Sequence, residues 1–128
     1  MTPHFILYVS DQTASTGFYT NVLGLSPRLN VPGMTEFDLG NGAVLGLMPE
    51  VGVARLFDGR VNTGSRDECP SGAELYLIVD DAAAYNARAI ENGAKELSPL
   101  TERDWGHRAA YSLDRDGHVL AFAEILKD

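Results

Sequence analysis

Two stretches of the chain follow the same pattern, and this internal repeat limits the possible folds more than any other feature of the sequence. Each stretch starts with alternating apolar residues, passes through an aspartate, and continues with apolar residues at helical spacing up to a glycine. The copies span residues 4–24 and 72–93, and Asp11 matches Asp81 at a separation of 70 positions. Such a repeat predicts a fold built from two equivalent units.

Each copy opens with a predicted strand, at residues 4–9 and 74–79, whose side chains alternate between two faces of a sheet. One face is apolar in both copies, whereas the other carries polar and aromatic groups. The apolar face is therefore expected in the core. Its members are Phe5, Leu7 and Val9 in the first copy and Leu75, Leu77 and Val79 in the second; the opposite face carries His4, Ile6, Tyr8, Glu74, Tyr76 and Ile78.

A helix is expected after each strand, at residues 12–23 and 82–92. Aspartates just before these ranges can accept hydrogen bonds from free N–H groups of the first turn, and the glycines at 24 and 93 are typical helix ends. The candidate caps are Asp11, Asp80 and Asp81. The predicted buried stripes are Ala14, Phe18, Val22 and Leu25, broadened by Tyr19 and Leu23, in the first helix and Ala83, Ala87 and Ile90 in the second.

Further strands are expected after each helix. Residues 41–48 match residues 116–123 at a separation of 75, and Asn41-Gly42 is a strong signal for a two-residue hairpin turn. Both halves are therefore predicted to form βαβββ modules, in which one strand, one helix and three further strands follow one another. The predicted strands lie at residues 26–30, 34–39, 43–48, 95–97, 108–113 and 118–125, with a loop through Pro99 and Trp105.

The sequence predicts one α+β domain over residues 1–128, with module one at 1–50, a linker at 51–71 and module two at 72–128. A half of this size is marginal alone, so the two modules are expected to share one curved mixed sheet around a cleft. The linker is rich in glycine, and its residues 53–57 could form a helical turn or a small lid.

Composition excludes several kinds of partner. The net charge of −8 disfavours nucleic acids and anionic membrane surfaces and attracts cationic small molecules. No apolar run approaches the ~20 residues that span a bilayer. Cys69 is the only cysteine, so no internal disulfide can form, and the N-terminal residues lack signal-peptide features. These features favour a reduced, cytoplasmic setting.

Four short motifs resemble one known superfamily. The chain reads VSD at 9–11, VDD at 79–81, FYTNVLGL at 18–25 and DRDGH at 114–118. Together with the duplicated βαβββ unit, they are similar to the vicinal-oxygen-chelate superfamily. That superfamily includes glyoxalase I, extradiol dioxygenases, fosfomycin-resistance enzymes and bleomycin-resistance proteins. The resemblance implies a small-molecule ligand and a homodimer, and it raises a role in antibiotic resistance.

The resemblance also implies where a divalent metal would bind. The first-strand ligand positions are His4 and Glu74, but the last-strand positions are Gly46 and Ala121, which have no ligating side chain. A catalytic zinc site needs at least three protein ligands, so no metal or other cofactor is favoured. A metal bound by His4 and Glu74 remains the alternative, with a third ligand from Glu36, Glu50 or His107. His118 and Glu124 are expected on the helix side or in solvent.

Glu74 is the candidate catalytic residue, as a general base or a counter-charge, and burial would raise its pKa. Its alternative is a solvent-exposed rim position. Tyr8 and Tyr76 are expected either to form an aromatic wall or to pack in the core, and Trp105 either caps a ligand or anchors a surface loop. The full candidate set for ligand binding is His4, Tyr8, Met48, Glu74, Tyr76, Trp105, Tyr111 and Ala121.

Three functions remain open at this stage. The favoured one is a small-molecule-binding protein of the bleomycin-resistance type that sequesters an aromatic or cationic ligand without metal. The alternative is a metal-dependent lyase or dioxygenase with a displaced ligand set. The third is a dimerisation or regulatory module without a ligand. A calcium loop at 114–125 is disfavoured because Ile125 stands where a bidentate glutamate is required.

Overall fold

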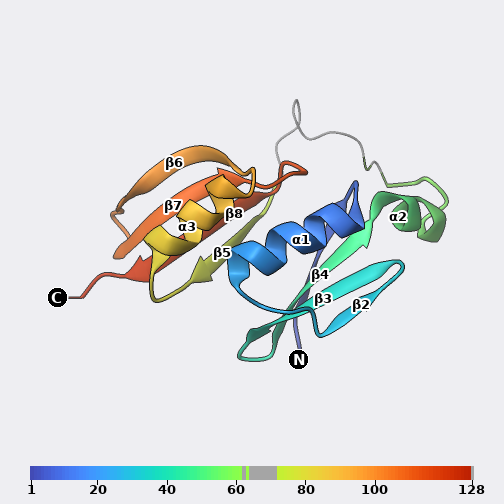
Figure 1. Cartoon of the computed structure of the whole chain (residues 1–128), viewed down its shortest axis with the longest axis horizontal. Coiled ribbons are helices and arrows are strands. Elements are labelled where there is room, and N and C mark those ends of the chain that lie inside the picture. The colour runs from blue at the N-terminus through green and yellow to red at the C-terminus, as the bar shows by residue number, and fades with distance from the viewer. Residues whose placement is uncertain (62, 64–71, 128) are drawn as a thin grey trace. The chain divides into compact units, whose positions relative to one another are not determined.

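The computed structural model describes residues 1–61, 63 and 72–127. The chain divides into two compact units, Met1–Gly64 and Ser65–Asp128, each of which contains one βαβββ module (Figure 1). The boundary falls inside the range predicted as a linker. The α+β class and the duplicated module are confirmed.

Module one forms a four-stranded mixed sheet with one helix on it. The strand order is β1-β4-β3-β2; β1 pairs with β4 in parallel, and the other neighbours are antiparallel. The elements are β1 (His4–Val9), α1 (Gln12–Leu23), β2 (Leu29–Val31), β3 (Met34–Gly40) and β4 (Ala43–Pro49), followed by α2 (Glu50–Leu56).

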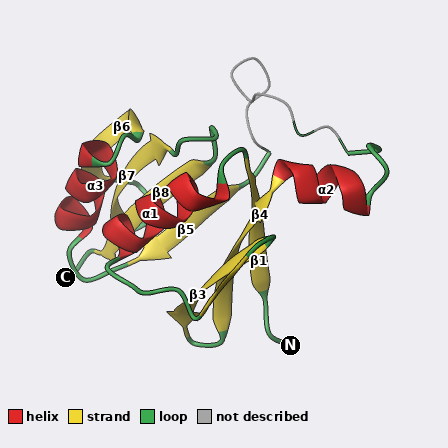
Figure 2. Cartoon of the chain, turned by 45° about the vertical axis from the view of Figure 1, so that its right-hand side comes forward, coloured by secondary structure: helices red, strands yellow, loops and turns green. Residues whose placement is uncertain are grey.

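Module two repeats this topology, with the strand order β5-β8-β7-β6 and a parallel pair between β5 and β8 (Figures 1 and 2). Its sheet is separate from that of module one, so the single sheet expected from the sequence is two four-stranded sheets. A shared cleft remains a prediction. The elements are β5 (Glu74–Ile78), α3 (Ala82–Glu91), β6 (Lys95–Glu102), β7 (His107–Leu113) and β8 (Val119–Ile125).

Local sequence signals produce the predicted turns. The Asp11 side chain accepts a hydrogen bond from the N–H of Ala14 at 3.0 Å, and α1 ends at Gly24 in the left-handed conformation. Asn41 and Gly42 have φ values of 51° and 81°, as a type I′ turn requires, and they join β3 to β4. These short-range interactions depend only on neighbouring residues, which is why the sequence predicts them.

The core of module one lies between α1 and the sheet. Phe18 and Val22 of the predicted stripe are buried, together with Tyr19 and Leu23, whereas Leu25 is exposed. They face a sheet whose buried residues include Phe37, Leu45 and Leu47. One prediction is wrong here: Phe5, expected in the core, is 52% exposed. It lies near the start of β1, an edge strand of the sheet.

The predicted stripe of α3 is wrong. Ala83, Ala87 and Ile90 are exposed, and the buried residues of the helix are Ala82 and Ala89. The carboxylate of Glu124 on β8 accepts a hydrogen bond from the N–H of Ala82 at 2.7 Å and so fixes the rotation of the helix. Three consecutive alanines carry no information about which face is buried. The same contact places Glu124 on the helix side, as predicted.

Two predicted boundaries also change. Helix α2 occupies the start of the range predicted as a linker, and it includes most of the segment at 53–57 expected to form a helical turn. Strand β6 continues through Pro99, which was predicted to lie in a loop. Proline is tolerated there because β6 is an edge strand and its pairing with β7 shifts register between Ser98 and Thr101. In the part of the chain that the structure describes, no helix is long and apolar enough to cross a membrane.

Asp81→Ala is expected to lower the free energy of unfolding by about 1 kcal/mol, because the Asp81 side chain accepts a hydrogen bond from the N–H of Ala84 at the start of α3. Urea denaturation followed by circular dichroism measures this change. Asp80→Ala is the matched control, since Asp80 is exposed and makes no side-chain hydrogen bond to any described residue. Equal losses for the two variants would contradict the assignment of Asp81 as the cap.

Candidate functional site

The predicted site residues lie on the sheet face opposite the helix in each module, here called the distal face. In module one, β1 and β4 pair Ile6 with Gly46 and Tyr8 with Met48, and His4 shares their side of β1. Thr35 lies on the other face, where its hydroxyl contacts Thr16 of α1. His4, Tyr8 and Met48 therefore share the distal face of module one.

Gly46 lies under two side chains on this distal face. A Cβ atom built at Gly46 would come within 3.1 Å of Ile6 Cγ1 and 3.2 Å of Met34 Sδ. Distances this short are tighter than ordinary van der Waals contact. A side chain at this position would therefore require Ile6 and Met34 to move by a few tenths of an ångström.

Beside Gly46, the carboxylate of Glu36 is held by basic groups. Arg28 contacts Glu36 Oε1 through both Nε and one terminal nitrogen, each at 3.0 Å. His4 Nδ1 lies 3.5 Å from Glu36 Oε2. His4 and Glu36, two of the residues considered as metal ligands, are therefore neighbours, but the positive charge of Arg28 already balances that of the glutamate.

The distal face of module two carries an aromatic cluster. Ala121 on β8 pairs with Tyr76 on β5 and with Tyr111 on β7, so the three side chains lie in one row across the sheet. The two phenol rings are 6.4 Å apart between centroids, on either side of a fully buried alanine. Because the side chain of Ala121 is small, the two aromatic rings make up most of the surface of this row.

Trp105 and His107 complete the cluster. The indole N–H of Trp105 donates to the Tyr76 hydroxyl at 3.0 Å, and that hydroxyl lies 2.7 Å from Nδ1 of His107. Because indole can only donate, the hydroxyl accepts from Trp105 and can donate to a neutral His107. The imidazole also stacks on the Tyr76 ring at 5.7 Å. Both neighbours therefore fix the orientation of Tyr76.

From the sequence, His107 is expected only as a displaced metal ligand and not as a member of the aromatic cluster. Its signal was its position in β7, four residues before Tyr111, which places both side chains on the same face of the strand. The predicted strand began one residue too late, at 108, and this error left His107 in the preceding loop.

Burial and nearby charges both act on the phenol of Tyr111. Burial raises the pKa of the Tyr111 phenol, and the charges of Glu74 and Tyr76 raise it further, while Arg103 acts in the opposite direction. Tyr111 therefore remains a hydrogen-bond donor at neutral pH. Glu74 is exposed, which corresponds to the rim alternative and not to a buried general base.

Arg103 holds the hairpin that presents Trp105. One terminal nitrogen of its guanidinium donates to the carbonyls of Pro99 and Ala109 at 2.9 and 2.8 Å, and the group lies 5.3 Å from the centroid of the Tyr111 ring. The register shift at Pro99 interrupts the β6–β7 ladder, and these donors bridge the two strands where it is interrupted. No local sequence pattern distinguishes Arg103 from an exposed loop residue.

The site can now be compared with known proteins. The family model described as the Glyoxalase/Bleomycin resistance protein/Dioxygenase superfamily matches residues 2–122. The chain belongs to this superfamily. No curated protein sequence matches it.

Solved structures of the superfamily share this fold. A glyoxalase-related enzyme from Fulvimarina pelagi is 23% identical, with a TM-score of 0.83 over 97% of this chain and 87% of its own. A family enzyme from Burkholderia phytofirmans is 19% identical, with a TM-score of 0.78 over 96% and 97% of the two chains. A glyoxalase/bleomycin resistance protein from Albidiferax ferrireducens is 20% identical, with a TM-score of 0.74 over 95% and 97%. At these identities the likeness establishes the fold alone.

The donor set does not fit the divalent metal that enzymes of the superfamily are expected to hold. In module one, the family positions supply His4 but no donor at Gly46, which has no side chain, and Glu36 is a displaced candidate next to His4. In module two, Ala121 stands between two phenols. Over residues 1–61, 63 and 72–127, no three His, Cys, Asp or Glu side chains gather closely enough to hold a metal. We therefore derive no chemistry from a metal at these positions.

Proposed function

We propose that the chain binds and sequesters a small aromatic or cationic molecule on the distal face of module two, without a metal ion. The observation that carries this proposal is the aromatic cluster, in which Trp105 and His107 both hydrogen-bond to Tyr76 and the Tyr76 ring lies beside that of Tyr111. Aromatic faces held in fixed orientations stack on planar groups and attract cations. The bleomycin-resistance proteins of the superfamily provide the analogy for sequestration.

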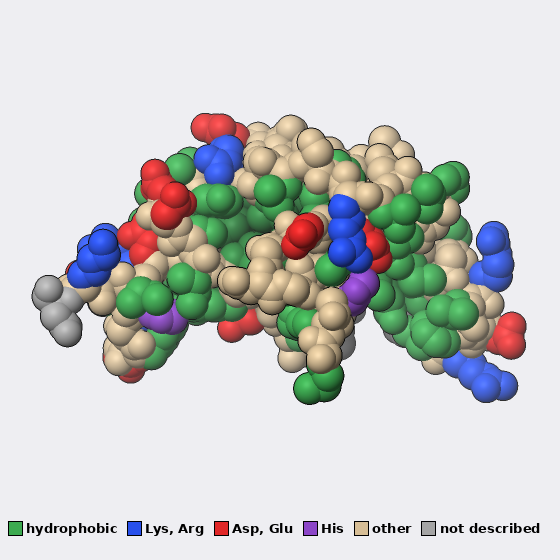
Figure 3. All heavy atoms as spheres, turned by 90° about the horizontal axis from the view of Figure 1, so that it is seen from below, with side chains coloured by type: hydrophobic (Ala, Val, Ile, Leu, Met, Phe, Trp, Pro, Cys, Tyr) green, Lys and Arg blue, Asp and Glu red, His purple; other side chains and the backbone are tan. Residues whose placement is uncertain are grey.

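Charge on this face supports a cationic group in the ligand. Glu74 is exposed, and its negative charge contributes to the raised pKa of the Tyr111 phenol. Figure 3 shows acidic and basic side chains interspersed in one view of the chain. A preference for a cation on the distal face of module two would come from Glu74.

Benzyltrimethylammonium is expected to quench Trp105 fluorescence saturably, because it offers both a ring and a cation to the cluster. Trp105 is the only tryptophan of the chain, so its emission reports on this site alone. Glu74→Gln should weaken binding about three- to tenfold by removing the counter-charge. Glu96→Gln, another exposed carboxylate of module two, is the matched control. No quenching by this probe or by benzyl alcohol would refute the proposal.

The alternative is a metal-dependent lyase or dioxygenase, and the observation in its favour is the contact between His4 and Glu36. These two side chains supply two of the three ligands that a catalytic site needs. Elemental analysis of protein purified without chelator separates the two functions. Stoichiometric metal that disappears in His4→Ala would establish the alternative and reject metal-free binding.

A homodimer, implied by the superfamily, is also part of the proposal. Analytical sedimentation of the purified chain tests it.

A further inference from the structure

A pocket lies in module one, between the start of α1 and the β2 edge of the sheet. It has a volume of about 420 Å³. Thr16 of α1 lines it and hydrogen-bonds to Thr35, so the pocket is on the α1 side and not on the distal face. None of the lining residues is charged, although the chain has a net charge of −8. The lining residues are Gln12, Thr13, Thr16, Asn30, Val31 and Pro32.

Hydrogen bonds at the buried hydroxyl of Thr35 determine what two of the lining side chains can offer. Thr35 Oγ1 donates to Asn30 Oδ1 at 3.3 Å and accepts from Gln12 Nε2 at 3.0 Å. It also lies 2.8 Å from Thr16 Oγ1. A hydroxyl has one hydrogen, so when that of Thr35 is directed to Asn30, Thr16 is the donor in its contact with Thr35.

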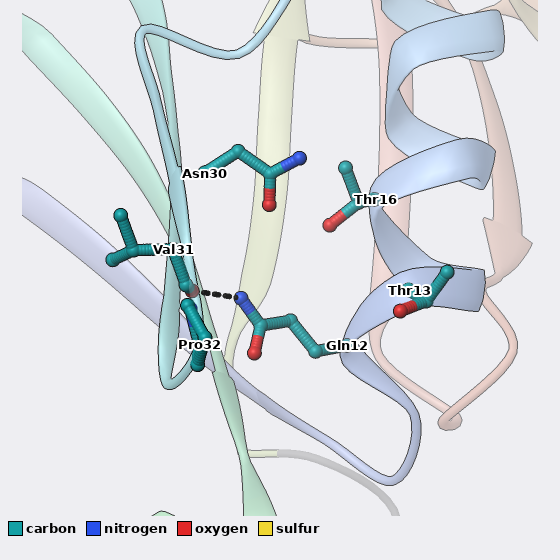
Figure 4. A pocket seen from close by; sticks show the side chains of 6 residues that line it. All are labelled: Gln12, Thr13, Thr16, Asn30, Val31 and Pro32. Atoms are coloured by element: carbon teal, nitrogen blue, oxygen red, sulfur yellow. Dashed lines mark hydrogen bonds between the residues drawn. The ribbon is translucent and has the colours of Figure 1, made fainter.

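Among the groups that bond to Thr35, two are therefore left for a ligand. Asn30 Nδ2 carries two N–H groups, and nothing within the described residues accepts from them. The hydroxyl hydrogen of Thr16 is used in the bond to Thr35, and the hydroxyl oxygen can still accept a hydrogen bond from a ligand. Figure 4 shows the side chains of Asn30 and Thr16 pointing toward one another across the pocket. The pocket thus presents a donor on the β2 side and an acceptor on the α1 side.

Hydrogen bonds from Gln12 hold the residues around these two groups in place before any ligand binds. Gln12 Nε2 donates to the carbonyl of Val31 at 2.8 Å, as Figure 4 also shows, and Gln12 Oε1 accepts from the N–H of Gly33 at 3.0 Å. These bonds tie the turn after β2 to the first turn of α1. A ligand would therefore meet walls that are already ordered, and it would not have to supply the free energy of ordering them.

We propose that this pocket binds a small neutral molecule that carries a hydrogen-bond acceptor beside a donor, as a primary carboxamide does. The carbonyl of the ligand accepts from Asn30 Nδ2, and its N–H donates to Thr16. A carboxylate has no donor for Thr16, and the lining residues that the structure describes include no cation to offset its desolvation. An ammonium group has no acceptor for Asn30.

Titration of the full chain with propionamide and with its charged isostere propionate, followed by ¹H–¹⁵N correlation spectra, tests the site. Propionamide is expected to shift the Asn30 side-chain resonances and the Thr13 and Gly33 amides saturably, with a dissociation constant of about 1–50 mM. Propionate should bind at least about fivefold more weakly. Equal affinity for the two probes, shifts that do not saturate, or shifts confined to other residues would overturn the proposal.

Asn30→Asp sharpens the test because aspartate can still accept from Thr35 but replaces the free N–H groups with an oxygen. We expect propionamide to bind about tenfold more weakly to this variant. Asn21→Asp makes the same chemical change on α1 outside the lining and should leave the affinity unchanged. A loss no larger than that of the control would count against the site. The comparison of the two probes uses the unaltered chain, so it remains decisive if Asn30→Asp disturbs folding.

Discussion

Phe122→Ala is expected to lower the free energy of unfolding of module two by about 3–5 kcal/mol. Phe122 is fully buried on β8, and its ring lies 5.2 Å from that of Tyr85 on α3. Truncation removes most of the apolar contact between helix and sheet and leaves a cavity that a sheet on one side cannot close. Trp105 belongs to the same module, so urea denaturation followed by its fluorescence measures the loss directly.

Ile125→Ala is the control for this prediction. Ile125 belongs to the same strand, but it is 62% exposed, so its truncation should cost less than about 1 kcal/mol. A loss below about 1 kcal/mol for Phe122→Ala would mean that α3 does not depend on this contact. That result would contradict the assignment of the core of module two to the α3 side of its sheet.

Features that depend on near neighbours in sequence were predicted well. The cap at Asp11, the turn at Asn41-Gly42 and the two βαβββ modules all follow from patterns a few residues long, repeated along the chain. Alternation along β1 and β5 also assigned His4, Tyr8, Glu74 and Tyr76 to one face of each strand. The strand register agrees with that assignment.

Features that depend on tertiary contacts were not predicted. The rotation of α3 is set by Glu124, which lies 42 residues away from Ala82 in the chain. The path of β6 through Pro99 is possible only because β6 is an edge strand, and strand order cannot be read from local composition. The hydrogen bonds from Arg103 to Pro99 on β6 and Ala109 on β7 also depend on tertiary contacts. A long-range partner selects one conformation from several that the local sequence allows.

The candidate site shows the same division. The sequence placed Ala121 on the same face as Tyr76 and favoured the core over the pocket wall for Tyr111, whereas the register places all three in one row. The hydrogen bond from Trp105 to Tyr76 depends on the hairpin geometry between β6 and β7, which no residue spacing specifies. Whether Glu74 is buried could not be decided from alternation alone, because alternation gives the face of a strand and not its depth in the fold.

Gly46→Glu is expected to lower the free energy of unfolding by about 3 kcal/mol or more, and it tests whether module one can accept the carboxylate that the superfamily's metal site would place there. The new side chain must displace Ile6 and Met34, which lie 3.1 and 3.2 Å from the position of its Cβ. It would also stand beside Glu36, its register partner on β3, whose carboxylate is already paired with Arg28. Thermal denaturation followed by circular dichroism measures the loss.

Gly17→Glu makes the identical chemical change in the same module, at an exposed position of α1 where a Cβ meets nothing within 4 Å. Since glutamate is a better helix former than glycine, this control should be stabilised by about 0.5 kcal/mol. Opposite signs for the two variants would show that the environment of Gly46, and not the added charge, prevents a donor at that position. A Gly46→Glu protein of unchanged stability that binds divalent metal would instead mean that Ile6 and Met34 yield readily. The metal-dependent alternative would then become the better account of the distal face of module one.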